Sequence, residues 1–178
     1  MNRLTSARQA LAASNIMEGL SLYQPTVVST IWAGLDIETS DINILCSYQD
    51  EAAYRSDLEQ FLSSFEFIEI ESGEQRVVAR FQFQNFPFEI FASPTPIEDQ
   101  SGWRHFQIMQ RLVELPYPTL ISDLVNCKRR GMKTEPAIAK LLRLEGDPYE
   151  SVLSLEQLSA LQLGEFVKKR LDHGARWQ

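Results

Sequence analysis

The chain has 178 residues, 44% of them hydrophobic, and a formal net charge of −7, which is enough apolar material to bury a core without disulfides. The acidic balance argues against a general nucleic-acid binder, because such binding depends on clustered Lys and Arg side chains. No stretch approaches the roughly 18 apolar residues of a membrane span, and Cys46 and Cys127 lack the spacing of a metal site or a disulfide framework. We therefore expect a soluble cytoplasmic protein with no membrane partner.

The first third of the chain predicts alternating helices and strands. Apolar residues at helical spacing, after a capping-box pattern, predict a helix over residues 7–20. A run rich in β-branched residues predicts a strand over 26–33, and alternating side chains predict a second strand over 41–46. An apolar stripe then predicts a helix over 51–64.

The middle of the chain predicts a run of strands. These cover residues 67–70, 77–84 and 86–92, and the second of them alternates in the manner of a half-exposed antiparallel strand. The dipeptide Gln84-Asn85 separates the last two runs and favours a tight hairpin between them.

Beyond Pro94 and Pro96 the apolar spacing becomes helical. Helices are expected at about 99–114, 119–130, 135–144 and 155–171, divided by Pro and Gly. The fold class is therefore α+β, with a mixed β-sheet and flanking helices first and a helical part last. We expect a sheet core over 1–100 and a helical region over 101–178 packed on it, either as two domains or as one.

Three polar side chains stand out on the predicted strands. Asp41 and Asn43 share the strand face opposite Ile42 and Ile44, and Glu89 is alone in an apolar run. A charge is seldom placed there without a partner or a metal, so one polar site on the sheet is expected. Two alternatives stay open: Asp41 could be an ordinary strand-start residue, and Glu89 could pair with Arg80 on the adjacent strand.

This order of features resembles the nucleotidyltransferase superfamily, whose pattern is a Gly-Ser turn, an Asp-x-Asp strand and a third carboxylate on a neighbouring strand. The matching segments are residues 40–44 and the strand around Glu89. More closely, the chain resembles a bacterial domain-of-unknown-function family placed in that superfamily. That resemblance runs over residues 33–41, 86–91, 103–105 and 131–149.

The resemblance implies a nucleotidyltransferase-like sheet core that binds a nucleoside triphosphate with Mg²⁺ and transfers a nucleotidyl group to an unknown acceptor. Asp41 would be a metal ligand, and Glu89 would match the third carboxylate, which helps to activate the acceptor hydroxyl. Ser29 and Thr30 match the turn that receives the phosphates through backbone N–H groups and a hydroxyl.

Two departures from the superfamily pattern matter. Asn43 stands at the catalytic position of the second Asp, and an amide oxygen is a weaker Mg²⁺ ligand than a carboxylate. Ser29 stands where the turn carries Gly, so a side chain occupies a place of close backbone approach. The competing hypothesis is a noncatalytic member of the fold whose helical C-terminal part acts as a protein-interaction module.

A group of cations lies between residues 128 and 143, namely Lys128, Arg129, Arg130, Lys133, Lys140 and Arg143. They suit a solvated helix end, where the helix dipole favours positive charge, or a local site for an anionic substrate. In the second interpretation Lys133 is a candidate contact to the bound nucleotide.

Overall fold

A computed structural model describes residues 2–174, and the chain divides into two compact units. The first comprises residues 1–32 and 39–103, and the second comprises 33–38 and 104–178. The elements of the first unit are α1 (Arg3–Ser14), α2 (Ile16–Gly19), β1 (Thr26–Val27), α3 (Thr30–Ala33), β2 (Ile42–Ser47), α4 (Glu51–Leu62), β3 (Glu66–Gly73), β4 (Arg76–Phe83) and β5 (Phe86–Ser93).

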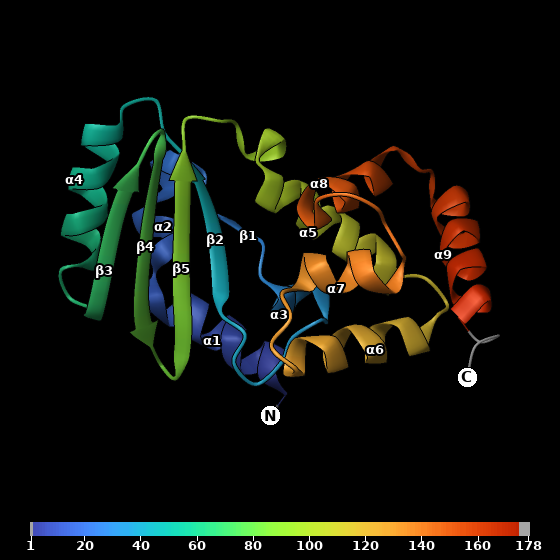
Figure 1. Cartoon of the computed structure of the whole chain (residues 1–178). Coiled ribbons are helices and arrows are strands. Elements are labelled where there is room, and N and C mark those ends of the chain that lie inside the picture. The colour runs from blue at the N-terminus through green and yellow to red at the C-terminus, as the bar shows by residue number, and fades with distance from the viewer. Residues whose placement is uncertain (1, 175–178) are drawn as a thin grey trace. The chain divides into compact units, whose positions relative to one another are not determined.

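The five strands form one mixed sheet in the order β1-β2-β5-β4-β3 (Figure 1). Strands β2 and β5 run parallel, whereas the other neighbouring pairs are antiparallel. The expected α+β class with a mixed sheet is therefore confirmed. The parallel pair places the strand that follows Asp41 beside the strand that carries Glu89.

The core of the first unit explains which way the polar residues face. Ile42, Ile44 and Cys46 are fully buried in one cluster with residues of α1 and α4. Because successive strand side chains point to opposite faces, Asp41 and Asn43 belong to the other face, and both are half-buried there. Figure 1 shows α1 behind the sheet.

The second unit is helical. Its elements are most of α5 (Ser101–Val113), then α6 (Pro118–Arg129), α7 (Thr134–Leu141), α8 (Pro148–Leu153) and α9 (Ala160–Gly174). The side chain of Arg104 pairs with Glu156 at 2.7 Å, and His105 is buried with its Nε2 atom 2.9 Å from the carbonyl oxygen of Tyr149. None of the helices that the structure describes is long and apolar enough to cross a membrane.

The strand predicted over 26–33 is wrong beyond Val27, because the chain turns into the short helix α3. Ser29 caps this turn, since its hydroxyl accepts a hydrogen bond from the Ile31 N–H and its backbone carbonyl oxygen accepts one from the Trp32 N–H. The local capping chemistry of one serine therefore outweighs the β-propensity of its neighbours.

The ends of several predicted helices also shift. The first helix begins at Arg3, because the Asn2 side chain caps it by accepting from the Thr5 N–H. The helix predicted over 155–171 begins only at Ala160 as α9, and the separate helix α8, which Asp147 caps, lies outside the predicted helices. The hairpin at Gln84-Asn85 is confirmed, with positive φ angles of 47° and 66°.

Candidate functional site

The candidate site lies on the face of the sheet opposite to the one that packs against α1 and α4. Asn43 of β2 is the direct register partner of Glu89 on β5, and Asp41 precedes Asn43 by two residues on the same face. Neighbouring strands lie about 4.8 Å apart, so the side chains of such partners are adjacent. The structure therefore brings Asn43 and Glu89 together, with Asp41 one step along the strand.

Glu89 is engaged by an arginine across the sheet. The Nε atom of Arg80 donates a hydrogen bond to Glu89 Oε2 at 2.8 Å, and Arg80 Nη1 lies 3.4 Å from Oε2 of Glu71 on β3. The hydrogen bond to Glu89 raises the pKa of the Arg80 guanidinium above its usual range. The pairing left open as an alternative for Glu89 is thus confirmed, although the Arg80 side chain is 44% exposed and that of Glu89 is 31% exposed.

The Arg80 pairing makes a prediction about metal binding. Replacing Arg80 with Gln should tighten Mn²⁺ binding about fivefold, because an exposed ion pair of up to about 1 kcal/mol no longer competes for Glu89. The free energy of unfolding should fall by less than about 1 kcal/mol. Calorimetric titration with Mn²⁺ measures the first quantity and urea unfolding the second.

The control for this experiment is Arg76→Gln, which removes the same charge from an exposed position on the same strand. An Arg80→Gln protein that binds Mn²⁺ no better than the control would argue against Glu89 as a metal ligand.

The turn at Ser29 and Thr30 is hydrogen-bonded to the residues just before β2. Ser29 is fully buried, and its hydroxyl donates to the Asp41 carbonyl oxygen at 2.6 Å while accepting from the Ile31 N–H at 3.2 Å. The Thr30 hydroxyl donates to Ser40 Oγ at 3.4 Å. Because the Ser29 hydroxyl serves two backbone groups, a phosphate at this turn would rely on backbone N–H groups and on Thr30.

A hydrogen bond from α1 to the chain just before β2 could not be predicted from the sequence. Arg3 Nη2 donates to the carbonyl oxygen of Ser40 at 2.6 Å, and the guanidinium carbon lies 4.9 Å from the centre of the Phe86 ring. The hydrogen bond spans 37 positions of the chain, whereas sequence patterns of capping and periodicity report only on near neighbours.

The basic stretch after residue 127 belongs to the second unit, and its side chains differ in burial and in hydrogen-bond partners. Lys128 is buried and donates from Nζ to the Leu35 carbonyl oxygen, and Arg129 Nη2 lies 3.0 Å from Glu38 Oε1. These two cations therefore hold the segment 33–38. Lys133 is exposed at the N-cap position of α7, so it is accessible to an anionic ligand.

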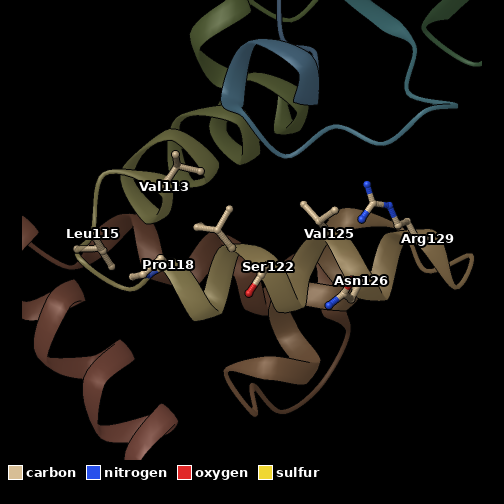
Figure 2. Close-up of a pocket in the computed structure, with 8 residues that line it drawn as sticks. Val113, Leu115, Pro118, Ser122, Val125, Asn126 and Arg129 are labelled. Atoms are coloured by element: carbon tan, nitrogen blue, oxygen red, sulfur yellow. The ribbon is translucent and has the colours of Figure 1, made fainter. Parts of the chain in front are cut away.

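A pocket of about 490 Å³ lies in the second unit, along one side of α6 (Figure 2). It contains none of the candidate carboxylates. Figure 2 shows that its lining residues come from the end of α5, the following turn and α6; they are Val113, Leu115, Pro118, Ile121, Ser122, Val125, Asn126 and Arg129.

Magnesium requires oxygen ligands, and the candidate site offers two carboxylates and an amide. Among residues 2–174, no group of three or more His, Cys, Asp or Glu side chains is arranged to hold a metal ion. Mg²⁺ often takes only one or two carboxylates and completes its shell with substrate phosphates and water. The donors Asp41 and Glu89 thus fit a metal that arrives with a nucleotide.

This fold resembles several solved structures. The Cid1 poly(U) polymerase bound to MgATP matches with a TM-score of 0.58 at 11% sequence identity, over 84% of this chain and 48% of that one. The GLD-2/RNP-8 complex matches with a TM-score of 0.60 at 11% identity, over 97% and 78%. A cytoplasmic RNA terminal U-transferase matches with a TM-score of 0.54 at 12% identity, over 84% and 44%.

These likenesses show a nucleotidyltransferase-like fold, and the chain spans about half the length of the Cid1 polymerase. No curated protein matches this chain in sequence. The model of one family, the domain of unknown function DUF4269, matches residues 9–155. This match covers most of the chain, which therefore belongs to the DUF4269 family.

Proposed function

We propose that this chain binds a nucleoside triphosphate together with Mg²⁺ and transfers a nucleotidyl group to an acceptor hydroxyl. One observation carries the proposal: a parallel strand pair sets Glu89 beside Asn43, two residues from Asp41, on the face of the sheet opposite to the core cluster. The fold shared with a poly(U) polymerase bound to MgATP supports it.

Each residue of the site would have its own role. Asp41 and Glu89 would hold Mg²⁺, which would neutralise phosphate charge and so lower the barrier to attack on the α-phosphorus. Asn43 would contribute a neutral amide oxygen. Thr30, with the backbone at Ser29, would receive the phosphates, and the role of Lys133 stays a prediction from the sequence.

The transfer itself is an in-line substitution. The acceptor oxygen forms a bond to the α-phosphorus while the bond to pyrophosphate breaks, and the hydroxyl proton passes to the carboxylate of Glu89. The proton would go to Glu89 Oε1, since Oε2 accepts the Arg80 hydrogen bond.

Thermal unfolding of the full chain with each nucleoside triphosphate, with and without Mg²⁺, tests the binding step. At a nucleotide concentration 100 times Kd, the free energy of unfolding should rise by about 2.7 kcal/mol, or about 5–10 °C in Tm. A protein that shows no Mg²⁺-dependent rise with any of the four nucleotides would contradict the proposal. Release of pyrophosphate in the presence of candidate acceptors then tests transfer.

A second candidate function is a noncatalytic protein-interaction module. Two observations favour it: Asn43 replaces a carboxylate of the superfamily pattern, and Glu89 is neutralised by Arg80. In this case the helical second unit would bind a protein partner, and the sheet would serve only as a scaffold.

Replacing Asn43 with Asp separates these two functions. The new carboxylate lies beside Glu89 and should strengthen Mg²⁺ binding about 30-fold, since a unit charge near a divalent ion contributes about 2 kcal/mol even in water-like surroundings. Calorimetric titration with Mg²⁺ and ATP measures the change, and a pyrophosphate assay measures any gained activity.

The control for Asn43→Asp is Asn126→Asp, which adds the same charge on the exposed face of α6. No gain over this control, together with no nucleotide binding, would favour the interaction module.

A further inference from the structure

The backbone on both sides of Asp41 is held by two side chains from different elements. Arg3 of α1 donates to the carbonyl oxygen of Ser40 at 2.6 Å, and Ser29 donates to the carbonyl oxygen of Asp41 at 2.6 Å. The first carbonyl belongs to the peptide plane before the Asp41 Cα atom, and the second belongs to the plane after it.

Holding both planes fixes the direction in which the Asp41 side chain leaves the backbone. Each peptide unit is planar, so a residue has only two soft backbone dihedrals, φ and ψ. When the planes on either side are fixed, both dihedrals of Asp41 are fixed, and so is the direction of its Cα–Cβ bond. Asp41 needs these two hydrogen bonds because it precedes β2, whose ladder of backbone hydrogen bonds begins only at Ile42.

The two holding side chains are themselves anchored. The Arg3 guanidinium lies over the ring of Phe86, the first residue of β5, so it contacts the strand of Glu89 as well as the approach to β2. Its bond to the carbonyl is charge-assisted and therefore stronger than a neutral one. Ser29 is fully buried, and the Ile31 N–H fixes its hydroxyl from the other side.

We infer that Arg3 and Ser29 are positioning residues that aim the Asp41 carboxylate at the bound metal and nucleotide. The inference rests on the proposed function, since it assigns Asp41 as a metal ligand. Arg3 precedes residues 9–155, the part of the chain that the family model matches, so the family match does not assign it this role.

Mn²⁺ binding in the presence of ATP, followed by electron paramagnetic resonance, tests this inference in the full chain. Arg3→Ala should weaken Mn²⁺ binding about 10-fold to 100-fold, the range for losing a group that orients a metal ligand. Added ethylguanidinium should restore part of the affinity, which a general loss of stability would not allow. Arg8→Ala is the matched control, because Arg8 is exposed on the same helix.

A second measurement does not depend on the nucleotide. Amide hydrogen exchange of residues 39–43 should accelerate in Arg3→Ala and not in Arg8→Ala. Ser29→Ala should have effects in the same direction, and the double variant should weaken Mn²⁺ binding by less than the product of the two single losses, because both side chains hold the same residue.

The outcomes are distinguishable. If the wild type binds no Mn²⁺ with ATP, the proposed function falls and this inference falls with it. If the wild type binds and Arg3→Ala binds equally well, the positioning role is wrong while the proposed function stands. A loss in Arg3→Ala with unchanged exchange at 39–43 would also overturn the positioning role.

Discussion

The Asp41→Asn variant should lose the Mg²⁺-dependent rise in Tm that nucleoside triphosphates give the wild type. Asn keeps the size of the side chain, and the hydrogen bond from Ser29 goes to the Asp41 backbone carbonyl, so the fold should be preserved. The variant lacks the charge that an Mg²⁺ ligand supplies, and with Asn43 beside it only the Arg80-bound Glu89 carboxylate remains. We therefore expect the full stabilisation of about 2.7 kcal/mol at 100 times Kd to vanish.

Differential scanning calorimetry with ATP and Mg²⁺ measures this change, and its control is Asp123→Asn. Asp123 is exposed on α6, so its replacement changes the net charge equally without touching the site. An Asp41→Asn protein that still gains the wild-type increment would rule out Asp41 as the metal ligand, whatever the nucleotide.

The largest loss of stability is expected from Phe88→Ala, about 3–5 kcal/mol in the free energy of unfolding. Phe88 is 1% exposed, and its ring stacks on Phe81 of β4 at 5.1 Å between centroids and meets Phe83 edge-on at 6.3 Å. Removing the ring leaves a cavity inside this aromatic cluster and removes the attraction between the rings.

Urea unfolding followed by circular dichroism gives this free energy, with Phe67→Ala as the matched control. Phe67 is also a strand phenylalanine, but it is 79% exposed, so its loss should change stability by less than about 0.5 kcal/mol. Equal costs for the two variants would contradict the core position of Phe88. Phe88 also neighbours Glu89, so a Phe88→Ala protein should bind Mn²⁺ more weakly even below its unfolding temperature.

Sequence patterns predict the sheet well where side chains alternate over several residues. Ile42, Ile44 and Cys46 are spaced two apart and buried together, so the strand and its polar face follow from hydrophobic burial alone. The strand beyond Val27 failed because one buried hydroxyl, that of Ser29, redirects the backbone, and composition does not reveal such a local hydrogen bond.

Sequence patterns also predict one part of the candidate site and miss another. Asp41, Asn43 and Glu89 can be predicted as neighbours, since a polar residue on an otherwise apolar strand is conspicuous. The partners that modify them cannot be predicted so easily. The sequence offers Arg80 as a partner of Glu89, but Arg3 donates to the Ser40 carbonyl oxygen from a helix 37 positions away, and only the folded chain brings those atoms together.

The segment 33–38 has a consequence for how this protein can be dissected by truncation. It follows the Ser29 turn and precedes Asp41, yet its compact surroundings are those of the second unit, where Leu35 is fully buried and its carbonyl binds Lys128. A fragment that ends at residue 100 would keep both candidate carboxylates, Asp41 and Glu89. It would lose Lys128 and Arg129, which bind this segment. Such a fragment would expose Leu35 to water, between the Ser29 turn and Asp41 in the chain. Cutting the gene between the sheet part and the helical part therefore does not yield two intact pieces.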